Sequence, residues 1–74
     1  MDIHHLVKMA NDIGDFFAAE PDPAKGAKGV ADHIRGFWDP RMRRQMFAYL
    51  DQSSGEGLTE IVLTALRTHR KEML

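Results

Sequence analysis

The sequence contains no cysteine, and its ten Lys and Arg residues are balanced by eleven Asp and Glu residues. Without cysteine the chain cannot form disulfides or bind zinc or iron–sulfur clusters through thiolates, so we expect a reducing compartment, by default the cytoplasm. The net charge of -1 gives no overall attraction to a polyanion. No apolar run approaches the roughly 20 residues that span a bilayer, and the first residues lack the basic start of a secretory signal. We therefore expect neither a membrane partner nor export.

The histidines do not form a recognisable catalytic or metal-binding motif. His4 and His5 are adjacent and point about 100° apart on a helix, so they do not chelate as a pair four residues apart would. His33 has no second histidine or carboxylate at a motif spacing, and no glycine-rich turn is present to hold a phosphate. A chain of 74 residues also buries only about 60% of its unfolded surface, which leaves little room for a deep cleft. We expect one small domain, residues 1–74, that is not an enzyme by itself and holds no cofactor or metal.

Apolar residues recur every three or four positions in four segments, which is the spacing of one face of a helix. The segments begin after residues that are typical helix N-caps, namely Asp2, Asp22, Asp39 and Thr59. Proline follows the second and third of these caps, at the first helical position. The turn-rich stretch DQSSGEG separates the third segment from the fourth, and no strand pattern is present. We predict an all-α fold, a small bundle of four short helices with a tight Asp-Pro bend between the second and third.

The second segment predicts a buried helix face together with a stripe of glycines. Its buried face should consist of Ala27, Val30, Ala31, Ile34, Phe37 and Trp38. The opposite face should carry Gly26, Gly29 and Gly36, each of which weakens a helix by about 1 kcal/mol relative to Ala. Two interpretations remain open: the glycines simply weaken this helix, or they form a smooth surface that a partner's backbone approaches closely.

The stretch GFWDPRMRRQ places the only Trp, a helix-breaking Pro and three arginines within ten residues. We expect Trp38 to be a core residue that also closes the bend. Arg43 falls in the apolar arc of the third helix, where either its charged head reaches past the core edge to water or its charge is held for a partner. Arginine together with Trp and Tyr is typical of interface hot spots. The bend is therefore a candidate contact surface.

Apolar surface on the first helix exceeds what one core-facing stripe needs. Met9 and Phe16 are seven residues apart and widen its apolar arc to about half of the circumference. They could meet a partner, or a second copy of the chain across a two-fold axis. A further alternative is a small helix-turn-helix-like nucleic-acid binder, whose basic surface would be Arg41, Arg44, Arg67, Arg70 and Lys71. The balanced net charge and the lack of a defined recognition helix argue against nucleic acid.

Three stretches that together span nearly the whole chain resemble a known family. HHLVKMANDIGDFFAAEPD, VADHIRGFWDPRMRRQMFAYLD and GLTEIVLTALRTH resemble, in this order, the delta subunit of cytoplasmic NAD-dependent formate dehydrogenases that contain molybdenum or tungsten. The motifs LVKMANDIG and FWDPRMRRQ carry most of the likeness. The resemblance implies an accessory, non-catalytic subunit that binds a large alpha subunit and supports its assembly, stability or cofactor maturation.

The resemblance also implies where the cofactors and contacts lie. Molybdopterin guanine dinucleotide and iron–sulfur clusters are expected in the alpha subunit, and FMN with further clusters in the beta and gamma subunits. None is expected in this chain, and its lack of cysteine agrees independently, because it has no thiolates to hold a cluster. By this resemblance, the residues that match the family's motif are the expected partner contacts, namely Trp38, Asp39, Pro40, Arg41, Met42, Arg43 and Arg44. Met9 and Phe16, which form a side stripe that widens the apolar arc of the first helix, are two further candidate contacts.

Overall fold

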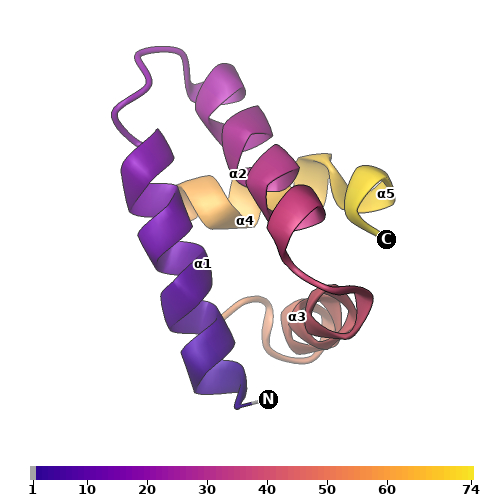
Figure 1. Cartoon of the computed structure of the whole chain (residues 1–74). Coiled ribbons are helices and arrows are strands. Elements are labelled where there is room, and N and C mark those ends of the chain that lie inside the picture. Colours follow the sequence, from indigo (N-terminus) through magenta and orange to yellow (C-terminus); the bar gives the residue numbers. More distant parts are fainter. Residues whose placement is uncertain (1) are drawn as a thin grey trace.

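The computed structural model describes residues 2–74, within which the regular elements are all helices and no strand occurs, and this confirms the predicted all-α fold class (Figure 1). Five helices follow one another: α1 (Ile3–Phe17), α2 (Pro23–Phe37), α3 (Pro40–Ser53), α4 (Glu60–Thr68) and α5 (Arg70–Met73). The predicted fourth helix is thus two helices. Its backbone leaves helical geometry at His69, where φ is -112° and ψ is 22°.

Aspartates begin the first three helices, as the sequence predicts. The carboxylates of Asp2, Asp22 and Asp39 each accept a hydrogen bond from a backbone N–H of the first turn, at 2.9, 3.0 and 3.0 Å. These bonds satisfy donors that have no partner inside the helix. Thr59 occupies the N-cap position of α4, but its hydroxyl makes no capping bond and has no hydrogen-bond partner within residues 2–74.

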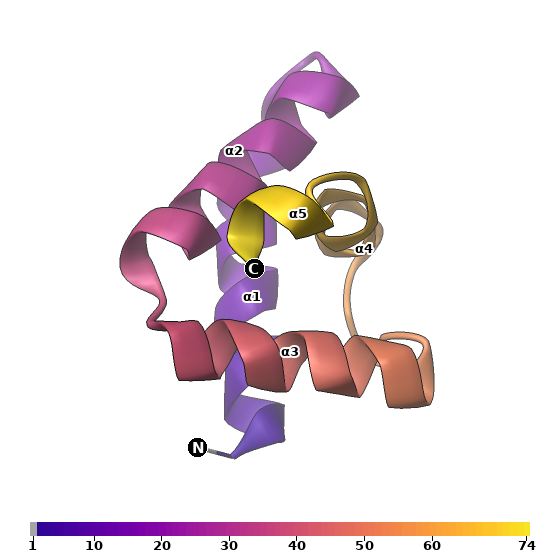
Figure 2. The same cartoon turned by 90° about the vertical axis from the view of Figure 1, so that its right-hand side faces the viewer.

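The helices surround one core to which each of them contributes. α1 and α2 are close at their connected ends and separate toward the end of α2, while α4 packs behind both (Figure 1). Figure 2 shows α3 crossing beneath them and α5 lying against α2 and α4. The largest fully buried side chains are Leu6, Val30, Ile34, Met46, Val62, Leu66 and Met73. Among the described residues, no helix is long and apolar enough to cross a membrane.

The last two residues of the predicted α2 face have opposite environments. Trp38 is buried, with 4% of its surface exposed, as expected for a core residue. Phe37 was expected in the same core but is 78% exposed, so this prediction was wrong. Phe37 stacks on His33, four residues earlier, along the half-exposed flank of α2, whereas Trp38 follows Val30 and Ile34 on the buried side.

The glycine stripe of α2 does not lie on a free face as expected. A Cβ atom at Gly26 would lie 3.0 Å from the carbonyl oxygen of Phe17, and one at Gly29 would lie 2.4 Å from the ring of Phe17. Only Gly36 has open space around it. Gly26 and Gly29 therefore allow the close approach of the end of α1, so the neighbouring backbone belongs to the same chain.

Asn11 fastens the loop between α3 and α4 to α1. Its side-chain amide donates to the carbonyl of Gly57 at 2.9 Å, and its amide oxygen accepts from the backbone N–H of Thr59 at 3.0 Å. Three residues of this loop have left-handed backbone geometry: Ser54, Gly55 and Gly57 have φ of 59°, 79° and 86°. α4 is thereby placed against the second half of α1.

Candidate functional site

An aromatic row crosses the face shared by α1 and α2. We use this name for Phe16, Phe17, His33 and Phe37. The rings of Phe16 and Phe17 meet edge to face with centroids 5.0 Å apart, and Phe17 meets His33 in the same manner at 6.4 Å. His33 stacks on Phe37 at 4.5 Å with an interplanar angle of 27°. The two end members, Phe16 and Phe37, are 75% and 78% exposed. The row therefore presents two exposed phenyl rings, at Phe16 and Phe37, joined by the half-buried rings of Phe17 and His33.

The aromatic row replaces the side stripe that the first helix suggested. Phe16 is exposed as expected, whereas Met9 is half-buried and packs against the core. The sequence did not reveal His33 and Phe37 as neighbours of Phe16, because they belong to another helix. The only available signal was the four-residue spacing of His33 and Phe37, which places them on one face of α2.

The three arginines of the first turns of α3, Arg41, Arg43 and Arg44, have different surroundings. Arg43 donates from Nη1 to the carbonyl oxygens of Arg35 at 3.0 Å and Trp38 at 2.7 Å. It therefore bonds to the last carbonyls of α2, which no N–H of that helix can reach. Arg41 and Arg44 are exposed. We call these two exposed residues the basic corner.

The residues around the basic corner hold its backbone. Asp39 caps α3, and its hydrogen bond from the N–H of Met42 lowers the pKa of its carboxyl, with smaller contributions from the nearby charges of Arg41 and Arg43. Pro40 is exposed at the start of α3, and Met42 is half-buried against the core. The basic corner therefore extends from a helix whose first turn is capped.

The basic residues near the other end of the chain are partly neutralised. Arg70 forms two hydrogen bonds to the carboxylate of Asp51, at 2.8 and 2.7 Å, and its guanidinium lies 4.8 Å from the centroid of the Phe47 ring. The hydrogen bonds from Arg70, together with its positive charge, lower the pKa of the Asp51 carboxyl. Arg67 and Lys71 are exposed. Arg70 is therefore held within the chain, which removes one member of the basic surface considered for nucleic acid.

Histidines and carboxylates do not gather into a metal site within residues 2–74. His4 and His5 are both exposed on α1. His69 pairs through Nδ1 with Glu72, which also accepts from Lys28 at 2.9 Å. The hydrogen bond from Lys28, and then that from His69, lower the pKa of Glu72. This cluster joins α5 to α2.

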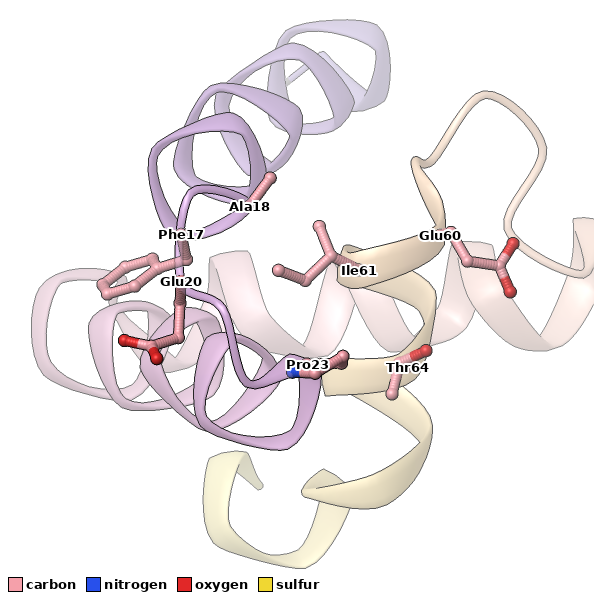
Figure 3. A pocket seen from close by; sticks show the side chains of 7 residues that line it. All are labelled: Phe17, Ala18, Glu20, Pro23, Glu60, Ile61 and Thr64. Atoms are coloured by element: carbon pink, nitrogen blue, oxygen red, sulfur yellow. The ribbon is translucent and has the colours of Figure 1, made fainter.

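A small pocket opens where the α1–α2 connection meets the start of α4 (Figure 3). Its volume is about 270 Å³. The residues that line it are Phe17, Ala18, Glu20, Pro23, Glu60, Ile61 and Thr64. Ile61 points into the space between the end of α1 and α4, the ring of Phe17 points away from it, and Glu20 and Glu60 lie on opposite sides. Sequence reasoning missed this pocket, because its members come from three separate segments.

A family model described as the NADH-dependent formate dehydrogenase delta subunit, FdsD, matches residues 5–66 of the chain. The matched residues include the aromatic row, the basic corner and every residue that lines the pocket. No curated protein and no solved structure gives a significant match.

Proposed function

Because the chain belongs to the NADH-dependent formate dehydrogenase delta subunit family, we propose that it is an accessory subunit, not catalytic by itself, of a cytoplasmic formate dehydrogenase complex. Its partner is the alpha subunit, which would hold molybdopterin guanine dinucleotide and iron–sulfur clusters. Beta and gamma subunits would carry FMN and further clusters and pass electrons to NAD. The chain supports the assembly, stability or cofactor maturation of the alpha subunit by binding to it.

The exposed aromatic row is the observation that carries this proposal. Phe16 and Phe37 leave about three quarters of their surfaces in water, at 75% and 78% exposure, although 15 apolar residues among positions 2–74 are buried in the core. Contiguous exposed apolar surface marks interaction sites in soluble proteins, and aromatic side chains contribute much of the energy there. We therefore assign the aromatic row as the surface of this chain that binds the alpha subunit.

The basic corner is assigned to the same interface as its charged part. Arg41 and Arg44 extend from the first turns of α3, which begins at the N-cap Asp39 and at Pro40. A guanidinium forms planar, paired hydrogen bonds with a carboxylate, so an acidic patch of the alpha subunit is the expected recipient. Trp38 and Arg43 hold the bend from inside, while Met42 and Met9 lie at the edges of the core and would contribute the apolar margin of the contact.

The aromatic row can be tested by affinity measurement with a tagged alpha subunit. The double variant Phe16→Ser and Phe37→Ser should keep its helicity, because both rings are exposed, but should bind at least about 30-fold more weakly, as expected for lost hot-spot residues. Leu74→Ser is the matched control, since Leu74 is also a large exposed apolar residue at 60% exposure. Normal binding by the double variant, with full formate oxidation by the reconstituted complex, would refute the assignment of the row.

A parallel pair of variants separates the basic corner from general charge effects. Arg41→Ala with Arg44→Ala should weaken binding and reduce its dependence on salt. Arg67→Ala with Lys71→Ala removes the same charge from exposed positions elsewhere and should have little effect. Equal losses in the two double variants would show that net charge, and not the corner, attracts the alpha subunit.

A further inference from the structure

Gly36 is a glycine that the fold of residues 2–74 does not require. A Cβ atom added to it would meet no side chain or other segment within 4 Å. A glycine within a helix weakens that helix by up to about 1 kcal/mol relative to alanine, and Gly36 belongs to the last turn of α2. The other five glycines are required by close contacts or by positive φ, namely Gly14, Gly26, Gly29, Gly55 and Gly57.

Gly29 shows how the same side of α2 is used within the chain. A Cβ atom at Gly29 would lie 2.4 Å from Cδ1 and 2.5 Å from Cε1 of Phe17, so the ring of Phe17 occupies the place where a side chain would begin. The same ring meets His33 edge to face, with centroids 6.4 Å apart. The missing side chain therefore lets an aromatic ring lie directly on the backbone of α2, beside His33.

Gly36 repeats the position of Gly29 two turns further along α2. Residues that are seven apart in a helix differ by only about 20° in direction and lie about 10 Å apart along the axis. His33 is between them, four residues after Gly29 and three before Gly36. α1 and α2 separate toward this end of α2 (Figure 1), and no ring of residues 2–74 lies over Gly36. The place that Phe17 fills at Gly29 is open at Gly36.

The open place at Gly36 adjoins both surfaces that we assign to the alpha subunit. Phe37, the exposed end of the aromatic row, is the next residue and stacks on His33 with centroids 4.5 Å apart. On the other side, Arg43 bonds to the carbonyls of Arg35 and Trp38 and so joins this turn of α2 to the helix that carries the basic corner. The place is therefore continuous with the proposed interface.

We propose that an aromatic side chain of the alpha subunit lies over Gly36 and packs against the stacked rings of His33 and Phe37. The source of this side chain rests on the proposed function. An aromatic ring suits the place better than an aliphatic or charged group, because edge-to-face and offset contacts between rings contribute more than their buried area alone. Gly36 then determines specificity, since any side chain at this position would take the place of the partner's ring.

Side chains of increasing size at Gly36 separate binding from stability. Gly36→Ala and Gly36→Gln replace a helix-weakening residue at an exposed position, so the urea midpoint should stay the same or rise. Affinity for the tagged alpha subunit should fall with side-chain size, by about tenfold or more for Gly36→Gln, because the partner's ring is overpacked. Ala24→Gln is the matched control, since Ala24 is an exposed small residue at the other end of α2, and it should bind normally. Normal binding by Gly36→Gln would overturn the proposal.

Photo-cross-linking identifies what lies over Gly36. Replacing Phe37 by p-benzoylphenylalanine keeps an exposed aromatic group at the next position, and its cross-links in the complex should map to a segment of the alpha subunit that contains Phe, Tyr or Trp. Replacing that aromatic residue by Ala should remove the sensitivity of binding to Gly36→Gln. Cross-links between two copies of this chain, or to a segment without an aromatic residue, would contradict the proposal.

Failure of this inference can be told apart from failure of the proposed function. If Phe16→Ser with Phe37→Ser binds weakly but Gly36→Gln binds normally, the aromatic row contacts the alpha subunit and no ring lies over Gly36. If the unchanged chain does not bind the alpha subunit at all, the proposed function is refuted, and the partner assigned to Gly36 is refuted with it.

Discussion

Arg43 and Arg44 are neighbours in the chain, yet only one of them is bonded to the rest of the molecule. Arg43 is half-buried and donates to two carbonyls at the end of α2, whereas Arg44 is exposed. The sequence left open whether Arg43 reaches water or waits for a partner. Its actual bonds join the end of α2 to the start of α3, and they depend on the course of the two connecting residues, which helical periodicity does not contain.

This difference predicts unequal effects of the two arginines on stability. Arg43→Ala should lower the free energy of unfolding by about 1–3 kcal/mol, because it leaves two carbonyls at the end of α2 without their charged donor. Arg44→Ala should change it by less than about 0.5 kcal/mol, as for most exposed positions. Urea unfolding followed by circular dichroism measures both. Equal stability of the two variants would show that the bonds of Arg43 are replaced by water without cost.

Phe37 shows which residue-scale predictions fail. Helical spacing correctly placed Val30, Ile34 and Trp38 in the core, because they follow one another at four-residue steps along the buried side of α2. The same spacing placed Phe37 there, but Phe37 shares the flank of α2 with His33, and a helical period does not say how wide an arc the neighbouring helices cover. The aromatic row was therefore missed although each of its residues was visible in the sequence.

At the scale of elements, local chemistry predicted the helices well and their contacts poorly. Three Asp caps and two proline starts are local signals, and the structure places all of them at helix starts. The division of the last helix at His69 has no comparable signal. The close packing of Gly26 and Gly29 on Phe17 could not be read either, because it depends on how α1 crosses α2.

The cap of α3 predicts a pH dependence of stability. The hydrogen bond from Met42 and the charge of Arg41 lower the folded-state pKa of Asp39. A lowered pKa means that the stabilisation is fully present above the unfolded value of about 4 and is lost as the pH falls through the folded value. Asp39→Asn keeps a capping oxygen but no longer titrates. Its melting temperature should therefore fall less than that of the unchanged chain between pH 5 and pH 2.5.

A control variant makes this measurement specific to the cap. Asp15→Asn removes the same charge from an exposed position of α1 that caps no helix, and its melting temperature should fall with acid as steeply as that of the unchanged chain. Asp51 and Glu72 also have lowered pKa values, so part of the acid sensitivity should persist in Asp39→Asn. If Asp39→Asn retains the whole of it, the cap contributes nothing to the acid sensitivity.

At the scale of the whole molecule, the nearly neutral net charge conceals an uneven distribution. Acidic residues dominate the segment between Lys8 and Lys25, whereas the basic corner lies at the start of α3. The sequence indicated the basic side, because Arg41 and Arg44 are only three positions apart in one stretch. It did not predict the pocket, since the lining residues Glu20 and Glu60 are 40 positions apart and border the same pocket only through the packing of α4 on α1 and α2. Surfaces assembled from distant segments are the part of the candidate site that local patterns cannot supply.

The whole molecule also depends on its short last helix. Met73 is 1% exposed and packs in the core against residues from the other helices, while Glu72 bonds to Lys28 of α2. Replacing a buried methionine by alanine costs about 2–5 kcal/mol. A chain of 74 residues has a total stability of about 4–11 kcal/mol. Loss of this one side chain should therefore remove a large share of the stability.

We accordingly predict that Met73→Ala lowers the urea midpoint strongly, and that in the least stable case it leaves a measurable unfolded fraction in buffer. Met73→Leu keeps the apolar volume and should cost less than about 1.5 kcal/mol. Leu74→Ala alters the next residue, which is 60% exposed, and should cost almost nothing. These three variants separate burial from mere position near the end of the chain. Should Met73→Ala unfold at the same urea concentration as Leu74→Ala, α5 would not be part of the cooperative core, and the packing of its methionine against α2 would contribute nothing to folding.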